Sequence, residues 1–196
     1  MKRGVGERVL FLRSFVAHPR QVGAILPTSR SAVRDMLDLT SFADARCVLE
    51  FGAGTGVYTR EILARLRPDG RLLAFEVDSN LASTLADQFQ DSRLQVINDS
   101  AENVKAYLNG VRADRIVSGL PFTSLPANVR HDIFERSREV LASDGVMLVL
   151  QYSPLIQPEL KRRFASVRRR ISLLNVPPAF LFACEQPQMT SGQGAR

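Results

Sequence analysis

The residues best suited to chemistry lie in VLEFGAGTG, residues 48–56, where an apolar run ends in a glycine-rich turn. Gly52, Gly54 and Gly56 let the backbone approach a ligand closely, and a helix that begins after the turn offers free N–H groups to an anionic group. A dinucleotide-binding turn needs a small residue at the position of Val57, and the G-K-[ST] ending of a phosphate-binding loop is absent. The turn therefore favours a nucleoside ligand without phosphates.

Acidic side chains follow the next two apolar runs. Glu76, in FEVD, lies about twenty residues past the glycine turn, where an acid at a strand end can accept hydrogen bonds from both ribose hydroxyls. Asp99 and Ser100, in NDS, are placed to contact an adenine amine or ring. Plainer explanations are a solvated acid at Glu76 and a helix cap at Asp99 or Ser100, and a cap is compatible with ligand contact. With the glycine turn, these acids fit a ligand such as S-adenosylmethionine.

A second turn, SGLPF (118–122), can hold the substrate. The hydroxyl of Ser118 and the carbonyls of Gly119 and Leu120 are hydrogen-bond acceptors that this turn can present to a substrate. Phe122, together with Tyr152 at the end of a later apolar run, can hold a cationic product by cation–π contact worth about 0.5–2 kcal/mol. Core packing explains Phe122 equally well. In open α/β sheets ligands lie at the carboxyl ends of the strands, so we expect all these features at one edge.

The elements that position these residues follow from the pattern after residue 46, where short apolar runs alternate with helical stretches. This alternation predicts an α/β fold of the Rossmann-like, doubly wound type with a mostly parallel, seven-stranded sheet. The last strand is expected to be antiparallel, because RRRISLLNVPPAFLFACEQ joins two runs through a Pro-Pro turn without a helix. The ligand-binding domain is predicted at residues 46–186, with a polar, disordered tail at 187–196.

Residues 1–45 are predicted to form an N-terminal helical segment of the same domain. A first helix over residues 5–17 would dock one apolar stripe on the body and leave a second stripe as a lid or membrane contact. This second stripe consists of Arg8, Phe11 and Phe15. A second helix is expected to begin at Thr28 or Ser29, either of which can cap it, and to run through SAVRDML.

The composition limits which partners and which kinds of binding site we expect for this protein. The 196 residues carry a formal net charge of +6, which suits nucleic acid, an anionic membrane or mere solubility. Cys47 and Cys184 lie in apolar runs, as core thiols of a reducing compartment do. No metal is expected, because His18 and His131 have no neighbour at ligand spacing. Neither a signal peptide nor a membrane span is visible, so we expect a cytoplasmic protein that associates with membranes peripherally.

A basic segment at residues 160–170, LKRRFASVRRR, places six cations around Phe164 and Val167. Together with the N-terminal stripe, it is expected to contact an anionic membrane surface, where each nearby cation adds about 1 kcal/mol. The same cations suit RNA phosphates. The charge of this segment therefore does not distinguish an anionic membrane from RNA as the partner.

VLEFGAGTG, FEVD and NDS, in this order, resemble the class I S-adenosylmethionine-dependent methyltransferases over most of residues 46–186. The resemblance implies that the glycine turn holds the methionine part of the cofactor, that the acid after the second strand binds ribose, and that the acid after the third strand faces adenine. The acid within the turn motif is expected to orient the turn or the cofactor amine. The implied cofactor-binding residues are Glu50, Gly52, Ala53, Gly54, Gly56, Glu76, Val77, Asp99 and Ser100.

Two subfamilies are similar around SGLPF. Ribosomal RNA adenine dimethylases carry Asn-Leu-Pro-Tyr or a close variant there, and their Asn accepts bonds from the adenine amine, whereas this chain has Gly119. Bacterial phospholipid N-methyltransferases resemble this chain at S-G-L-P, at HPRQVGAILPTSR (18–30) and at QYSPL…NVPPA (151–179), with a departure at Ser153. The resemblance implies methylation of the amine of an aminophospholipid, of the phosphatidylethanolamine type, at the membrane surface. An RNA adenine N6-methyltransferase, a small-molecule methyltransferase and a non-catalytic adaptor remain alternatives.

Overall fold

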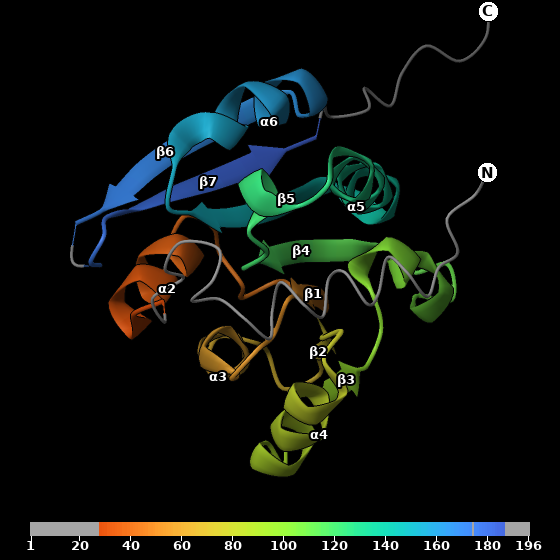
Figure 1. Cartoon of the computed structure of the whole chain (residues 1–196). Coiled ribbons are helices and arrows are strands. Elements are labelled where there is room, and N and C mark those ends of the chain that lie inside the picture. The colour runs from red at the N-terminus through yellow and green to blue at the C-terminus, as the bar shows by residue number, and fades with distance from the viewer. Residues whose placement is uncertain (1–27, 174, 187–196) are drawn as a thin grey trace, which may run out of the picture.

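The computed structural model describes residues 28–173 and 175–186, which form a seven-stranded sheet with helices on both faces (Figure 1). The strand order is β3-β2-β1-β4-β5-β7-β6. Strands β1 to β5 pair in parallel, and β7 is antiparallel to both β5 and β6, which confirms the predicted fold class. The strands are β1 Cys47–Phe51, β2 Arg71–Phe75, β3 Leu94–Ile97, β4 Ala113–Ser118, β5 Leu141–Gln151, β6 Ser166–Ser172 and β7 Ala179–Glu185.

Helical segments follow β1 to β4, as the alternation in the sequence predicted, and the helix between β5 and β6 was not predicted. The helices are α2 Arg30–Leu37, α3 Val57–Leu63, α4 Ser79–Gln88, α5 Ala127–Val140 and α6 Gln157–Arg163, with 3-10 helices η2 Ala101–Tyr107, η3 Phe122–Ser124 and η4 Pro154–Ile156. Ser29 caps α2, since its hydroxyl accepts a hydrogen bond of 3.2 Å from the backbone N–H of Ala32. The helix expected over residues 5–17 and the tail expected over 187–196 lie outside the described residues.

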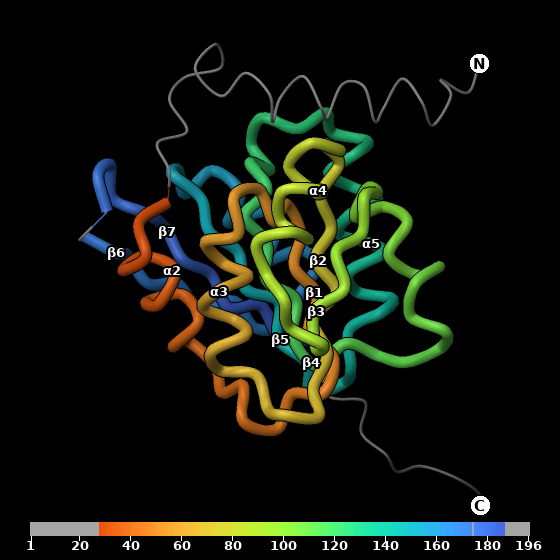
Figure 2. Tube along the Cα trace, turned by 90° about the horizontal axis from the view of Figure 1, so that it is seen from below, coloured from red at the N-terminus to blue at the C-terminus, as the bar shows by residue number. Residues whose placement is uncertain are grey.

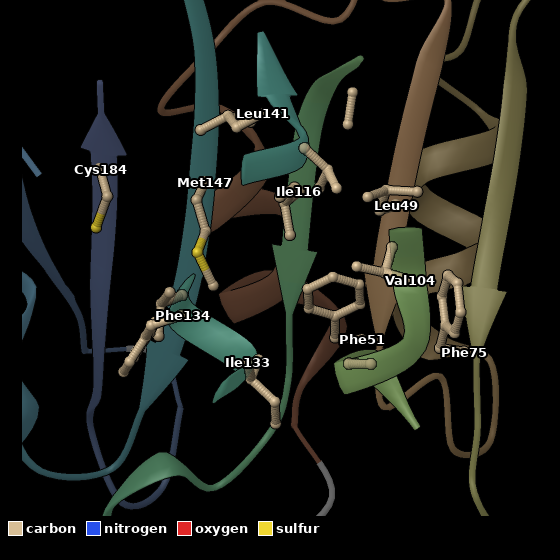
Figure 3. Packing of buried hydrophobic residues seen from close by; sticks show 14 of the residues in the cluster. Leu49, Phe51, Phe75, Val104, Ile116, Ile133, Phe134, Leu141, Met147 and Cys184 are labelled. Atoms are coloured by element: carbon tan, nitrogen blue, oxygen red, sulfur yellow. The ribbon is translucent and has the colours of Figure 1, made fainter. Parts of the chain in front are cut away.

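Two hydrophobic layers sandwich the sheet. Figure 2 shows α2 and α3 on one side of the central strands and α5 on the other. All five residues of β1 are buried, as a central parallel strand requires, and Leu49 and Phe51 face α5. Figure 3 shows this layer, in which strand residues such as Ile116 and Met147 pack against Ile133 of α5. Val48 faces the opposite layer, which α2 and α3 cover.

The topology brings the chain segments of interest to one edge of the sheet. Because β1 to β5 are parallel, the connections that follow them all leave at the carboxyl edge. The strand order reverses between β1 and β4, and ligands of open α/β sheets bind at such a reversal. β6 runs in the direction of β5, because both are antiparallel to β7. The connection from β6 to β7 therefore lies at the same edge.

The basic segment at residues 160–170 is divided between α6 and β6, and its apolar residues face inward. Phe164 is buried in the layer that α5 covers, and Val167 packs against that layer. Phe164 is therefore not available to a membrane, whereas the membrane contact expected of the cations around it stays a prediction. Arg163 also pairs with acids, at 3.0 Å from Glu159. Among the described residues, no helix is long and apolar enough to cross a bilayer.

Both cysteines are free and buried, as the apolar runs around them predicted. Cys47 begins β1 and Cys184 lies in β7. Burial raises the pKa of the Cys184 thiol to about 12, so this sulfur stays protonated at neutral pH. Both thiols belong to the packing of the sheet.

Candidate functional site

The glycine turn leads from β1 into α3 with three residues in the left-handed region. The φ angles of Gly52, Gly54 and Gly56 are 77°, 54° and 79°. The N–H groups of Gly52 and Ala53 both donate to the carbonyl of Phe75, at 2.9 and 3.1 Å, which ties the turn to the end of β2. A Cβ on Gly54 would meet no atom within 4 Å, so this part of the turn is open to a ligand.

Gly56 has a packing role that the sequence analysis missed. A Cβ at this position would lie 2.6 Å from Leu85 Cδ1 and 2.6 Å from Phe89 Cε2. The missing side chain therefore makes room for α4 and the residue after it, not for a ligand. The predicted cofactor contact of Gly56 stays a prediction and concerns its backbone alone, because the side of its Cα where a Cβ would lie packs against the protein.

We expect Gly56→Ala to lower the free energy of unfolding by about 2–4 kcal/mol, because alanine would be strained at this φ and would overpack Leu85 and Phe89. Gly110→Ala is the matched control. Gly110 has a φ of 80°, but a Cβ there would meet nothing within 4 Å, so its replacement should cost only about 1 kcal/mol. Urea unfolding of both variants measures the difference, and equal losses would contradict the packing role.

Glu76 follows β2, the strand next to β1, and its carboxyl group is hydrogen-bonded to the glycine turn. Its Oε2 accepts a hydrogen bond of 2.8 Å from the N–H of Gly54, and its Oε1 accepts one of 2.9 Å from the N–H of Asp78. Burial raises the pKa of this carboxyl, and the backbone N–H groups partly oppose the shift. Each carboxylate oxygen has a further lone pair, so Glu76 can accept ribose hydroxyls without giving up these bonds.

Asp99 and Ser100 follow β3, and both combine a structural role with a position at the pocket. The Oδ2 of Asp99 accepts a hydrogen bond of 2.7 Å from the hydroxyl of Tyr107, and its Oδ1 accepts one of 2.8 Å from Asn103 Nδ2. Ser100 caps η2 by accepting a bond from the N–H of Glu102. The cap expected from the sequence is confirmed for Ser100, and Asp99 fixes the start of η2.

These side chains lie around one pocket at the carboxyl edge, with a volume of about 440 Å³ including its mouth. Six of the predicted site residues line it: Gly52, Glu76, Val77, Asp99, Ser100 and Leu120. Ala101, Leu125 and Ile133 complete the apolar wall. A slot with apolar walls and two carboxyl groups suits a flat, uncharged ring joined to a polyhydroxylated sugar.

Glu50 lies under the glycine turn in the other layer and is 1% exposed. Its Oε2 accepts a hydrogen bond of 2.8 Å from the hydroxyl of Thr59, whereas its Oε1 has no hydrogen-bond partner among the described residues. Burial is the main reason that the pKa of Glu50 is raised to about 8. A buried acceptor without a donor is costly, so Glu50 fits a ligand that brings an ammonium group. The pocket therefore suits the nucleoside part of such a ligand, and Glu50 suits the ammonium of an amino-acid part.

The SGLPF turn crosses the end of β1 and packs against the glycine turn. The N–H of Gly119 donates to the carbonyl of Phe51 at 3.1 Å. The carbonyl of Leu120 accepts a bond of 2.8 Å from Gln151 Nε2. A Cβ on Gly119 would lie 3.1 Å from Tyr58 Cε2, so the tyrosine ring covers the place where a side chain would begin.

Tyr58 and Gln151 are site residues that the sequence analysis missed. The available signals were weak: a tyrosine directly after the glycine turn, and a polar residue at the end of an apolar strand. Gln151 is buried and fixes the carbonyl of Leu120. The hydroxyl of Tyr58 donates to Thr28 Oγ1 at 3.4 Å, and the hydroxyl of Tyr152 lies 3.0 Å from the same oxygen. Three hydroxyl groups thus gather beside Gly119.

The side chain of Phe122 does not lie beside these hydroxyl groups. The expected cation–π contact between Phe122 and a cationic product is therefore wrong. Its side chain is 0% exposed and stacks on Phe134 of α5, with ring centroids 4.4 Å apart. The ring therefore completes the core. Tyr152 remains a candidate for substrate contact from the end of β5, and Ser118 is buried, with its Oγ accepting a bond of 3.4 Å from the N–H of Leu120.

The sequence of this chain is similar to the sequences of known methyltransferases. Residues 48–145 match the model of a methyltransferase domain. An ornithine lipid N-methyltransferase of Singulisphaera acidiphila is 31% identical to this chain over 180 residues, which cover 89% of this chain and 94% of the relative. The two chains therefore align along nearly their whole lengths.

More distant similarities follow. A ribosomal RNA small subunit methyltransferase A of Nostoc sp. is 24% identical over 92% of this chain and 63% of its own length. Among solved structures, a putative rRNA-methylase from Clostridium thermocellum superposes with a TM-score of 0.63 at 14% identity, covering 84% of this chain and 99% of that chain. At this identity the superposition concerns the fold alone.

Proposed function

The chain belongs to the class I S-adenosylmethionine-dependent methyltransferases, and we propose that within this family it methylates the primary amine of a membrane lipid. S-adenosylmethionine is the methyl donor of this family. Phosphatidylethanolamine is the expected acceptor, and the similarity to the ornithine lipid N-methyltransferase of Singulisphaera makes an ornithine lipid the other acceptor to be tested. Both lipids offer a primary amine at a membrane surface, so the protein would work in peripheral contact with a bilayer.

For the cofactor, we assign the pocket beside β2 and β3 to the adenosine part. Glu76 would accept bonds from the ribose hydroxyls, and Val77 and Leu120 would contact the ring. Glu50 would accept a bond from the cofactor ammonium with the oxygen that has no donor among the described residues. Gly54 leaves the space that the methionine part requires. When bound, S-adenosylmethionine supplies an electrophilic methyl group on its sulfonium.

For the acceptor, the SGLPF turn provides main-chain oxygens rather than a catalytic side chain. An alkyl ammonium must lose a proton before its lone pair can attack, and a site without water favours the neutral form. The carbonyls of Gly119 and Leu120 would accept the remaining N–H bonds and aim the lone pair at the methyl group. Gln151 holds the Leu120 carbonyl in place, and this oxygen keeps a second lone pair for the amine. Fixed orientation supplies most of the expected acceleration.

The observation that carries the lipid proposal is the contact between Gly119 and Tyr58. Recognition of a base edge calls for a polar side chain at this turn, and a site that lacks a partner for a base edge discriminates poorly. Here even a Cβ would be crowded by the tyrosine ring, at 3.1 Å. A primary amine needs only the main-chain acceptors.

A second candidate is methylation of an RNA adenine amine. The similarity to the Nostoc ribosomal RNA methyltransferase and the net charge of +6 favour it. The absence of a side chain at Gly119 speaks against it.

The full chain, incubated with methyl-labelled S-adenosylmethionine, tests the two candidates directly. Separate arms contain vesicles with phosphatidylethanolamine, vesicles with an ornithine lipid, and ribosomal RNA. We expect label in one of the two lipid arms and none above background in the RNA, because only the lipid amine fits the acceptors of the turn. Label in the RNA alone would reverse the ranking.

A further inference from the structure

We propose that the connection between β6 and β7 is a docking surface for an anionic lipid bilayer, next to the place where the amine is methylated. This inference rests on the proposed lipid substrate. The docking tip, as we call it, consists of Ile171, Leu173, Val176, Pro177 and Pro178, all of which are exposed. The side chains of Leu173 and Val176 are 75% and 79% exposed.

The docking tip lies at the carboxyl edge of the sheet, on the side of the candidate site. In Figure 1 it is found at the left end of β6 and β7, to which the arrowheads of β4 and β5 also point. Leu155, which is 77% exposed, follows β5 at the same edge. In the described part of the chain the other large exposed apolar residue is Val111, which precedes β4 and so lies at the opposite edge.

The exposed apolar side chains of the docking tip gather in one connection between two strands. Single exposed apolar residues are common, but several at one loop mark an interaction surface. A bilayer can take up such side chains at the boundary between head groups and acyl chains, where each contributes by leaving water. Leu173 and Val176 are also far more exposed than apolar residues farther along β7, such as Leu181 and Phe182, which are fully buried.

The charges beside the docking tip favour an anionic surface. The sequence RRRISL leads into it, and Arg168, Arg169 and Arg170 are all exposed. Arg168 pairs with Glu185 at 3.0 Å, and Arg169 donates to Gln157 at 2.9 Å. Arg170, directly before the tip, makes no ion pair with any described residue. Cations next to exposed apolar side chains complement lipid phosphates above acyl chains.

A series of contacts connects the docking tip to the SGLPF turn. Asn175 Oδ1 accepts a hydrogen bond of 2.9 Å from the N–H of Ser29. The neighbouring Thr28 bonds the hydroxyl of Tyr152 at 3.0 Å and accepts a bond from Tyr58, whose ring covers Gly119. A lipid whose acyl chains stay in the bilayer beside the tip could therefore present its head group along this edge.

The test is binding of the full-length double variant Leu173→Asp with Val176→Asp to vesicles of phosphatidylglycerol and phosphatidylcholine. These vesicles contain no primary amine, so binding is measured whether or not the proposed substrate is right. We expect partitioning at least about tenfold weaker than for the unchanged chain, because two apolar side chains no longer enter the bilayer. Arg170→Gln should weaken partitioning about fivefold at low salt and have little effect at high salt.

Val111→Asp is the matched control, since it adds a charge at an exposed apolar position on the opposite edge. It should bind vesicles as the unchanged chain does. Affinity for S-adenosylmethionine should be unchanged in the double variant, which shows that its fold is intact. The proposal is overturned if the double variant partitions like the unchanged chain, if Val111→Asp loses binding equally, or if the unchanged chain binds ribosomal RNA but not the vesicles.

Discussion

Replacing Glu50 by glutamine is expected to stabilise the ligand-free protein while weakening its binding of S-adenosylmethionine. Burial raises the pKa of Glu50 from 4.5 to about 8. Glu50 thus contributes stability below about pH 4.5 that is lost progressively as the pH rises to about 8. A glutamine does not titrate, so Glu50→Gln should be more stable than the unchanged protein by about 2–4 kcal/mol at pH 8 and nearly equal at pH 4.5.

Urea unfolding of both proteins without ligand, at several pH values between 4.5 and 8, measures this difference. The same pH dependence in both proteins would contradict a raised pKa at Glu50. Thr59→Val is a useful control, because it removes the one hydrogen bond that Glu50 accepts from a described side chain. It should raise the pKa of Glu50 further and steepen the loss of stability with pH.

Cofactor binding gives the second readout of the same substitution. At pH 7 the ligand-free Glu50 is mostly protonated, and an ammonium placed beside it would lower its pKa. Binding should therefore release up to about one proton, detected by calorimetry in buffers of different ionisation enthalpy. In Glu50→Gln this release should vanish, and affinity should fall by about 2 kcal/mol through loss of a charge-assisted bond. A calorimetric enthalpy that is independent of the buffer would place the ammonium elsewhere.

Replacing Glu76 by alanine should weaken the binding of S-adenosylmethionine by about 1–3 kcal/mol, or roughly 5- to 150-fold. The variant loses the acceptors proposed for the ribose hydroxyls and leaves the N–H groups of Gly54 and Asp78 without the bonds that Glu76 accepts. Calorimetric titration of the variant measures the loss.

Asp78→Ala separates a ribose contact from simple loosening of the loop. Asp78 caps α4 by accepting bonds from Asn80 and Leu81, and it is not part of the pocket wall. Its loss should lower the free energy of unfolding by about 1 kcal/mol. Cofactor affinity should remain within about twofold of that of the unchanged protein. Unchanged affinity in Glu76→Ala, or an equal loss in both variants, would remove Glu76 from the ribose site.

The features that sequence reasoning could predict are local ones. The strands of a parallel sheet are buried on both faces and appear as short apolar runs, so β1 to β5 were recognisable without structural information. Gly52, Glu76 and Asp99 lie at the ends of such runs. Once the sheet is parallel, their arrival at one edge follows from the chain direction alone.

The features that it missed depend on residues far apart in the chain. Gly56 looks like part of a ligand-binding turn until Leu85 and Phe89 fill the space beside it. The direction of Phe122 is decided by Phe134, which offers a stacking partner in the core. Tyr58 acquires its position beside Gly119 only when α3 packs against the sheet.

The expected exposure of Phe164 in the basic segment was wrong for a related reason, whereas the membrane contact of the cations in this segment stays a prediction. The pattern of cations around Phe164 resembles an amphipathic surface helix, but the chain changes from α6 to β6 there and Phe164 turns into the core. The exposed apolar residues lie farther along, in the β6–β7 connection, whose NVPPA sequence indicated a turn and a family resemblance but not an exposed apolar surface. The spacing of apolar residues within a single helix or strand could not predict these exposed side chains.

The most direct test of the central claim is the crystal structure of this protein with S-adenosylhomocysteine. We expect both ribose hydroxyls within about 3.2 Å of the carboxylate of Glu76, the ring in the slot between Val77 and Leu120, and the sulfur facing Gly119. A complex in which the protein's own side chains fill that slot, or in which the ligand lies away from Glu76, would contradict the account.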